Sequence, residues 1–431
     1  MTDLQRQFYD MLMRSQYWAA ERMQEHQRSQ LAQLLLHARR TVPFYEHRLD
    51  AVFRPDGTID WDRWTEIPIL TRADLRNGFA EMQASELPPG HGRRLITRSS
   101  GSTGQPTATA KSSLALMAGD AALARSFAWH DIDTTKRMVR LYGDTPGIAP
   151  WPDGRTSGWG PRFLLEQRDT CLELDLFSSV EQQLDFVHRF TPAYLSGLVT
   201  RLEAVALAAR QQRLAINLEA ILPFGESVSP RFRALMREVF DARVVEMYSS
   251  EETDKIAHQC PDEPCLHINS ELMIVEVVDA GGLPVARGER GEVVITPFYN
   301  TAQPLIRYRI GDLAVAAGPC ACGRHLPAIP RIEGRVSHLF RTPDGRMILP
   351  NVPDDAVARM GITQWQLAQT TPTTAEFRYV AAVPGSSPPA DDLLTVLMGG
   401  IESELDIELR PMDAFPPASK HISYRNELSR D

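Results

Sequence analysis

Strand-like and helical stretches alternate through the middle of the chain, and this alternation limits the folds that are open to it. Strand-like runs occur at 137–143 (RMVRLYG), 193–198 (AYLSGL), 220–227 (AILPFGES) and 242–250 (ARVVEMYSS). Between them, LEAVALAARQQ and SPRFRALMREVF have helical spacing. Such alternation is typical of βαβ units, in which helices connect parallel strands. We therefore predict an α/β fold built on mainly parallel sheets.

The character of the sequence changes twice after this region. From about residue 266, β-rich runs joined by Gly-containing turns predict a smaller, largely antiparallel subdomain. Beyond RIEGR (331–335), strand-like runs and one helical run predict a separate α+β domain. Since 431 residues exceed one ordinary core, we expect an N-terminal domain over 1–335, including the β-rich subdomain at about 266–335, and a small C-terminal domain over 336–431. Residues 1–40 have helical spacing.

The charge balance restricts the partners that the protein can have. The net charge is −9 and the isoelectric point is near 5.7, which argues against nucleic acid or an anionic membrane as the main partner. No apolar run approaches the length of a membrane span, and the N-terminus has no uninterrupted apolar segment of the signal-peptide kind. We expect a cytoplasmic protein.

One stretch, RSSGSTGQPT (98–107), is unlike the rest of the chain. It follows the strand-like RRLIT, and its two glycines allow successive backbone N–H groups to turn toward one anion. The dense hydroxyls and the strand ahead of it favour a phosphate-binding loop over a flexible linker. It is not a Walker loop, because it lacks the Lys-Ser/Thr ending. The residues expected to donate to phosphate are Ser99, Ser100, Gly101, Ser102, Thr103 and Gly104.

Four of the five cysteines fall into two close pairs, Cys260 with Cys265 and Cys320 with Cys322. In a reducing compartment, paired cysteines indicate a metal more readily than a disulfide. Four thiolates predict a tetrahedral, structural Zn²⁺ site, in which His267 is an alternative to Cys265 as the fourth ligand. The competing interpretation is four free thiols.

The loop SSGSTGQPT resembles the signature loop of the adenylate-forming enzymes, which include acyl-CoA synthetases, adenylation domains and luciferases. Four further segments resemble the family's motifs in the same order: FGES (224–227), VVEMYSSEETDKIA (244–257), PLIRYRIGDLA (304–314) and RIEGRV (331–336). The N-terminal segment and EIPILTRADLR are similar to phenylacetate–CoA ligase-like and capsule-associated relatives. The family's loop ends in Lys, where this chain has Thr107, a change tolerated in the phenylacetate–CoA ligase branch.

The resemblance implies a nucleotide site and assigns residues to it. Gly225, Glu226 and Ser227 would pack beside the adenine, and Glu246 and Tyr248 belong to the segment whose acidic residue accepts from the adenine amino group. Asp312 would hold the ribose hydroxyls, and Arg335 would contact ribose or phosphate. Ser249, Glu251 and Ile310 depart from the usual pattern.

Two residues receive catalytic roles from the resemblance. Glu252 aligns with the family's Mg²⁺-binding Glu, although another register gives that role to Glu251. Lys420, on the Pro/Ser-bounded stretch FPPASKHISYRNELSRD, aligns with the mobile lysine of a C-terminal lid that reaches the adenylation site. Phosphate charge is then spread by the loop, by the metal and by this lysine, so that no protein nucleophile is needed.

The implied function is ATP-dependent activation of a carboxylic acid, expected to be aromatic, as an acyl-adenylate, followed by transfer to coenzyme A. An alternative within the family is transfer to an amine or another nucleophile. A second alternative, from a different class, is a nucleotide-binding protein that turns over weakly, since Thr107, Glu251 and Ile310 depart from pattern. The expected cofactors are ATP, Mg²⁺ and structural Zn²⁺, and a homodimer is expected from the resemblance alone.

Overall fold

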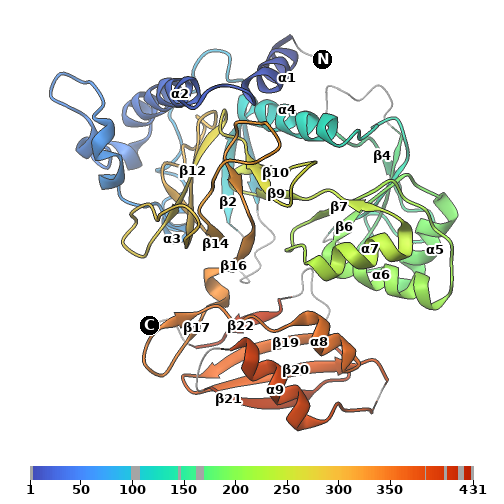
Figure 1. The fold of residues 1–431 in the computed structure, drawn as a ribbon. Coiled ribbons are helices and arrows are strands. Elements are labelled where there is room, and N and C mark those ends of the chain that lie inside the picture. The colour runs from blue at the N-terminus through green and yellow to red at the C-terminus, as the bar shows by residue number, and fades with distance from the viewer. Residues whose placement is uncertain are drawn as a thin grey trace. The chain divides into compact units, whose positions relative to one another are not determined.

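The computed structural model describes residues 3–98, 107–143, 147–161, 169–383, 385–401, 405–415 and 422–428. These form two compact units, one from 1–228 and 235–333 and the other from 229–234 and 334–431 (Figure 1). The α-helices are α1 (Asp3–Ser15), α2 (Ala20–Thr41), α3 (Arg72–Asn77), α4 (Ser113–Trp129), α5 (Val180–Phe190), α6 (Val199–Gln211), α7 (Pro230–Phe240), α8 (Asp354–Arg359) and α9 (Ala390–Gly400). Short 3-10 helices occupy Pro43–Tyr45, Asp50–Val52, Trp61–Glu66 and Val336–His338.

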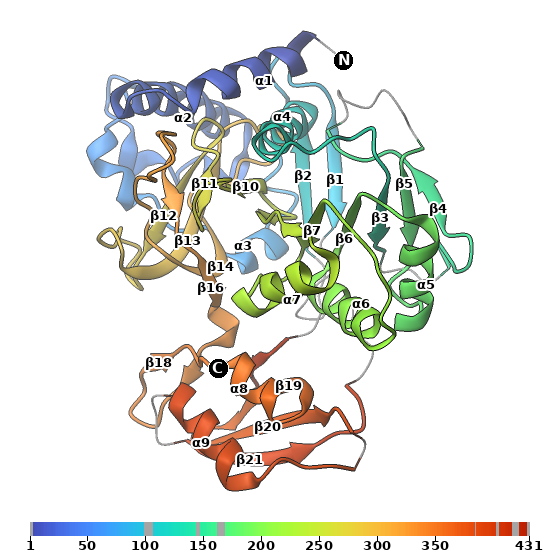
Figure 2. The same ribbon diagram turned by 45° about the vertical axis from the view of Figure 1, so that its right-hand side comes forward.

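The first unit contains the predicted parallel sheet. Its strands are β3 (Met138–Leu141), β4 (Arg155–Ser157), β5 (Cys171–Leu174), β6 (Tyr194–Leu198), β7 (Ala220–Phe224) and β8 (Arg243–Val244), in the order β4-β5-β3-β6-β7-β8. Every neighbouring pair is parallel except β4 and β5. Helices α5, α6 and α7 follow β5, β6 and β7 in turn and lie on one side of the sheet (Figure 2). The reason is that right-handed crossovers running in the same direction along a sheet place their helices on the same side of it.

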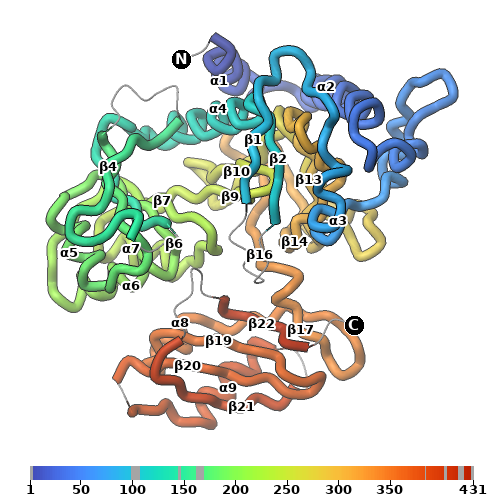
Figure 3. Tube along the Cα trace, turned by 180° about the vertical axis from the view of Figure 1, so that it is seen from behind, coloured from blue at the N-terminus to red at the C-terminus, as the bar shows by residue number. Residues whose placement is uncertain are grey.

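Two sheets with antiparallel pairing make up the β-rich part of this unit, except that the last strand, β16, ends in the second unit. One has the order β15-β11-β10-β9, from β9 (Met247–Ser250), β10 (Asp254–Gln259), β11 (Leu266–Ile268) and β15 (Ala328–Ile329). The other has the order β12-β13-β14-β16, from β12 (Met273–Val278), β13 (Arg290–Pro297), β14 (Tyr308–Val315) and β16 (Ile332–Arg335). A separate antiparallel pair joins β1 (Arg94–Arg98) to β2 (Ala108–Ser112), seen from behind in Figure 3.

The predicted α/β class is confirmed, and parallel pairing in the first unit is concentrated in one sheet. Helices separate β5 from β6, β6 from β7 and β7 from β8, and such crossovers allow parallel strands. The strands from β9 onward are joined by turns and loops instead, and short connections favour antiparallel pairing. The helical spacing of the first 40 residues is likewise realised, as α1 and α2.

A buried ion pair links α1, α4 and the β-rich sheets. Arg125 on α4 and Glu271 are both fully buried, and Arg125 Nη1 lies 2.6 Å from Glu271 Oε1. The hydroxyl of Ser15 donates to the same oxygen at 2.7 Å, and Arg125 Nη2 donates to Asn269 Oδ1 at 2.8 Å. Such additional hydrogen bonds offset the cost of burying a charge pair, and they connect the three elements, although the buried Nε of Arg125 has no hydrogen-bond partner among the described residues.

The second unit is an α+β sandwich with its own core. Its strands are β17 (Phe340–Arg341), β18 (Met347–Ile348), β19 (Ile362–Thr371), β20 (Thr374–Ala381), β21 (Asp406–Pro411) and β22 (Tyr424–Asn426), and the larger sheet has the order β21-β20-β19-β22. Leu367 and Phe377 on the central strands pack against Val357 of α8 and Leu393 of α9. Because side chains alternate along a strand, both helices cover the same face of this sheet (Figure 1).

Across the described residues, every helix is too short or too polar to cross a lipid bilayer.

Candidate nucleotide and metal sites

The structure brings together two of the predicted nucleotide-binding residues from distant segments. Tyr248 on β9 and Asp312 on β14 are both largely buried, and the Tyr248 hydroxyl donates to Asp312 Oδ2 at 2.8 Å. A hydrogen bond to an ionised carboxylate is stronger than one between neutral groups. One oxygen of Asp312 is therefore held by the protein, which fixes the orientation of the carboxylate.

The turn after β9 distinguishes the two adjacent glutamates. Ser250 and Thr253 close this turn, because the backbone N–H of Thr253 donates to Ser250 Oγ at 3.0 Å and the two hydroxyls lie 2.9 Å apart. The turn leaves Glu251 exposed and Glu252 buried. Glu252 therefore faces the protein interior, where a carboxylate oxygen is a suitable ligand for a hard cation such as Mg²⁺.

Arg72, which the sequence did not single out, connects this turn to the end of the predicted phosphate loop. Its Nη2 lies 3.7 Å from Glu252 Oε1, and its Nε donates to the hydroxyl of Thr107 at 3.2 Å. Arg72 is the first residue of α3, just after the N-cap Thr71. The only signal in the sequence was the capping pattern of LTRAD, which predicts a helix start but no contact with residues 35 and 180 positions further on.

The predicted residues 225–227 and Glu246 follow two neighbouring parallel strands, β7 and β8. Gly225 adopts a left-handed conformation (φ +76°) after β7, and Ser227 is exposed. The carboxylate of Glu226 accepts from the backbone N–H of Thr200 at 2.8 Å and from its hydroxyl, so it caps the start of α6. The backbone N–H of Glu246 donates to Gln259 Oε1 at 3.0 Å.

Several predicted residues cannot be placed beside these groups. Arg335 ends β16 and belongs to the second unit. The predicted catalytic lysine, Lys420, lies outside the described residues, as do Ser99, Ser100, Gly101, Ser102, Thr103 and Gly104 of the predicted loop. Thr107 is the first described residue after that loop.

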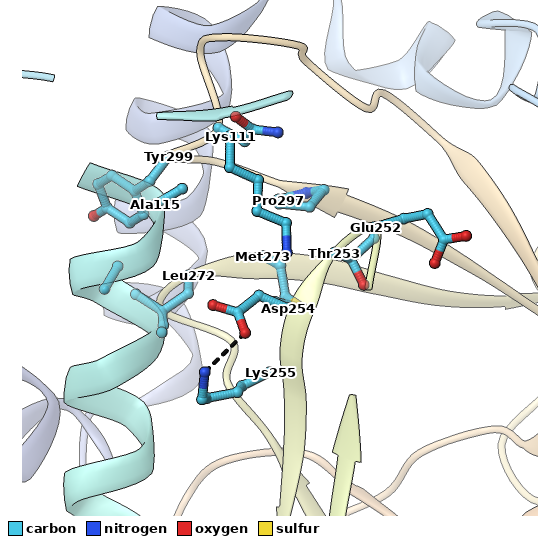
Figure 4. A pocket seen from close by; sticks show the side chains of 13 residues that line it. Lys111, Ala115, Glu252, Thr253, Asp254, Lys255, Leu272, Met273, Pro297 and Tyr299 are labelled. Carbon is cyan, nitrogen blue, oxygen red and sulfur yellow. Dashed lines mark hydrogen bonds and ion pairs between the residues drawn. The ribbon is translucent and has the colours of Figure 1, made fainter. Parts of the chain in front are cut away.

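A mostly apolar cavity with a few charged residues in its wall lies beside the Glu252 turn, between β2, α4 and β10. It is lined by Lys111, Thr253, Asp254 and Lys255 among others, and Lys255 Nζ lies 2.8 Å from Asp254 Oδ1. Figure 4 shows the largely buried Lys111 extending from β2 into the cavity, while Glu252 points away from Asp254 and Lys255. No local pattern in the sequence indicated this cavity, because its charged residues come from separate strands.

The two cysteine pairs meet in space at the end of the sheet that contains β10 and β11. Ligand atoms of Cys260, His267, Cys320 and Cys322 all lie within 4.8 Å of one another. Cys265 lies just outside this group, with its sulfur 3.6 Å from that of Cys320. The structure thus groups His267, the alternative fourth ligand, with three of the cysteines.

The geometry of this cluster suits a tetrahedral metal. Two sulfurs that bind one tetrahedral zinc at about 2.3 Å lie about 3.8 Å from each other. The sulfurs of Cys260 and Cys320 are 3.8 Å apart. His267 Nδ1 donates to the carbonyl of Leu326 at 3.1 Å, which leaves the lone pair on Nε2, 3.2 Å from Cys322 Sγ. This is the usual arrangement of a metal-binding histidine, whose second nitrogen is oriented by a backbone acceptor.

Burial controls the ionisation of these thiols. It raises the pKa of Cys260 to about 12 and also raises the pKa of Cys265. Burial acts in the same direction on Cys322, but hydrogen bonds from the backbone and side chain of Arg324 outweigh it and lower the pKa of Cys322. A divalent cation would ionise the coordinating thiols outright, so the donor set fits Zn²⁺.

Comparison with known proteins identifies relatives of this chain. No protein-family model matches the chain. It is 25% identical over 333 residues to the phenylacetate–coenzyme A ligase of Thermus thermophilus, covering 74% of this chain and 72% of that one. It is 24% identical over 359 residues to the phenylacetate–coenzyme A ligase of Escherichia coli, covering 78% and 74%.

Solved structures show the same fold. A 2-hydroxyisobutyryl-CoA ligase in its postadenylation state aligns with a TM-score of 0.70 and 20% identity, over 97% of this chain and 93% of that one. The amide bond synthetase McbA from Marinactinospora thermotolerans aligns with a TM-score of 0.54 and 15% identity, over 75% and 66%. The class defined by this fold and these motifs is the adenylate-forming superfamily, as the sequence predicted. Within that superfamily, the curated relatives support the phenylacetate–CoA ligase-like branch.

Proposed function

We propose that the protein activates a carboxylic acid with ATP and transfers the acyl group to coenzyme A. In the first step a carboxylate oxygen bonds to the α-phosphorus of ATP, and the bond from that phosphorus to the pyrophosphate oxygen breaks. In the second step the sulfur of coenzyme A bonds to the acyl carbon, its proton is released, and AMP leaves. The observation that carries this proposal is that three separate motifs meet: Tyr248 bonds to Asp312 directly, and Glu252 is joined to Thr107 through Arg72.

Different residues bind the nucleotide and neutralise its charge. We propose that Asp312 holds the ribose hydroxyls, with its carboxylate oriented by Tyr248, and that Glu252 rather than Glu251 binds Mg²⁺, because only Glu252 is directed inward. When bound, Mg²⁺ would neutralise phosphate charge. Lys420 remains our candidate for the cation that stabilises the developing charge at the α-phosphate.

An aromatic pair supports an aromatic acid as the substrate. Tyr142 follows β3 and Phe224 ends β7, and their ring centroids lie 5.7 Å apart with planes at 68°. Both are at the carboxyl ends of parallel strands, where ligands bind in open α/β sheets. Tyr142 is half exposed, so its ring is available to a planar apolar ligand.

We also propose that Cys260, His267, Cys320 and Cys322 bind a structural Zn²⁺. A closed set of four protein ligands leaves no open position for a substrate. The metal would join the β10–β11 turn to the segment between β14 and β15, which carries Cys320 and Cys322.

Acid-dependent exchange of radioactive pyrophosphate into ATP tests the first half-reaction. The panel would contain benzoates, arylacetates and hydroxy- or amino-substituted aryl acids. We expect exchange with at least one aryl acid, and no exchange with any acid would contradict the proposal. Thiol consumption then tests the second half-reaction. Exchange with an acid but no thiol consumption would favour an amine as the acyl acceptor. Transfer to an amine is the reaction indicated by the name of McbA, the amide bond synthetase with the same fold.

A further inference from the structure

The side chain of Arg72 contacts both Thr107 and Glu252. We propose that this arginine binds the phosphate groups of ATP. This inference rests on the proposed function and adds a phosphate-binding residue to it. The predicted loop contains hydroxyls and glycines but no lysine or arginine between Ser99 and Thr107. A triphosphate carries several negative charges, so its binding site requires positive charge beyond neutral donors.

The guanidinium of Arg72 contacts one residue from each of two predicted motifs. Nε donates to Thr107 Oγ1 at 3.2 Å, and Nη2 lies 3.7 Å from Glu252 Oε1. About a quarter of the Arg72 side chain is exposed, whereas Thr107 is 1% exposed. The guanidinium therefore joins Thr107, the last residue of the predicted loop, to the proposed metal ligand Glu252, and the Arg72 side chain is not fully enclosed.

The backbone that carries Arg72 is held firmly on both sides. Thr71 and Asp74 form a capping box at the start of α3, with Thr71 N donating to Asp74 Oδ2 at 2.8 Å. Just before it, Leu70 N donates to Arg307 O at 2.9 Å, and Leu70 O accepts from Arg309 N at 2.8 Å, beside β14. A rigid anchor of this kind reduces the entropy that a long side chain loses when it binds a ligand.

The chemistry of the side chain suits phosphate better than a lysine would. A guanidinium presents five N–H donors in a planar fork that matches two phosphate oxygens, and it stays charged at every physiological pH. Before a nucleotide binds, the carboxylate of Glu252 balances this charge within a site that is largely shielded from water. Thr107 positions the fork through its contact with Nε.

Direct binding of ATP and of adenosine separates a phosphate contact from a structural one. We expect Arg72→Met to weaken ATP binding in calorimetric titration by 10- to 100-fold and to change adenosine binding by less than twofold. The ATP affinity of Arg72→Lys should lie between those of Arg72→Met and the native protein, because lysine keeps the positive charge but lacks the planar fork of donors. Arg76→Met is the matched control, since Arg76 is an exposed arginine on the same helix, and it should bind ATP like the native protein.

A second variant tests the position of the charge. If Arg72 supplies the cation at the end of the loop, then Thr107→Lys placed in the Arg72→Met background should restore ATP affinity to within a few fold. The proposal would be overturned if Arg72→Met bound ATP as tightly as the native protein, or if it lost affinity for ATP and for adenosine equally. It would also be overturned if the double variant had the same melting temperature as Arg72→Met but did not recover ATP affinity. Acid-dependent pyrophosphate exchange by the native protein tests the proposed function separately, so a failure there is distinguishable.

Discussion

The hydroxyl of Tyr248 donates to a carboxylate oxygen of Asp312 at 2.8 Å, across 64 residues of sequence. Both side chains are largely buried, and each belongs to a different strand of the β-rich part of the first unit. The contact joins two motifs that were predicted independently to bind the nucleoside part of ATP. It also gives Asp312 a fixed orientation, because a buried carboxylate follows its strongest donor.

Removing Asp312 should weaken the binding of ATP. Asp312→Ala deletes two charge-assisted hydrogen bonds to ribose in the proposed complex, each contributing about 1.5–3 kcal/mol. We expect the KM for ATP to rise by roughly two to four orders of magnitude in pyrophosphate exchange, with a much smaller change in the KM for the acid. Tyr248→Phe keeps the carboxylate and removes only its donor, so it should have a smaller effect. Equal KM values for ATP in Asp312→Ala and the native protein would refute the assignment.

Lys420→Ala should reduce acyl-adenylate formation by several orders of magnitude and leave ATP binding largely intact. The reason is that the proposed lysine stabilises charge that develops only in the transition state. Pyrophosphate exchange measures the first quantity and calorimetric titration the second. Lys136→Ala is a suitable control, because Lys136 forms an exposed pair with Glu219 on the protein surface. Survival of pyrophosphate exchange in Lys420→Ala would show that another residue has this role.

Zinc analysis should find about one equivalent of metal per chain. Cys320→Ser and His267→Ala should each lose the metal and lower the melting temperature, because structural zinc contributes directly to folding. Cys171→Ala is the matched control, since Cys171 is buried in the parallel sheet away from the cluster, and it should retain the metal. Less than about half an equivalent of zinc in the native protein would count against the site.

Breaking the Arg125–Glu271 pair should strongly destabilise the first unit. Glu271→Ala leaves a fully buried guanidinium without its carboxylate, and such a loss costs about 3–5 kcal/mol of unfolding free energy. The exposed pair between Arg63 and Glu66 provides the comparison, because Glu66→Ala should change stability by less than about 1 kcal/mol. Chemical denaturation measures both. Similar losses in the two variants would mean that burial does not strengthen the first pair.

Acidification should destabilise the second unit through His338. Burial, with a smaller contribution from Arg335, lowers the pKa of His338 to about 4, whereas the unfolded chain has a value of 6.5. Because the unfolded state binds the proton more readily, the stabilising contribution is complete above pH 6.5 and is lost as the pH falls toward 4. The loss should be roughly 3 kcal/mol or less. His338→Gln should flatten the pH dependence of unfolding in this range, and an unchanged slope would contradict the prediction.

Local patterns were sufficient to predict the class of fold and the superfamily. Alternating strand-like and helical runs encode βαβ units, since the spacing of apolar residues determines which face of each element is buried. The SSGSTGQPT loop and the later motifs carry enough specificity in residue order to identify adenylate-forming enzymes. The distribution of parallel and antiparallel pairing was less evident, because it depends on whether a connection contains a helix, as between β6 and β7, or only a turn.

By itself, the sequence determined the α/β class, the order of the motifs and the residue types available for phosphate, metal and thiol chemistry. Tertiary structure alone decided which of two adjacent glutamates turns inward, that His267 joins three cysteines, and that Arg72 meets Thr107 and Glu252. The physical reason is that spacing along a chain specifies local backbone conformation, whereas contacts between distant residues depend on how strands pair and how helices pack on them.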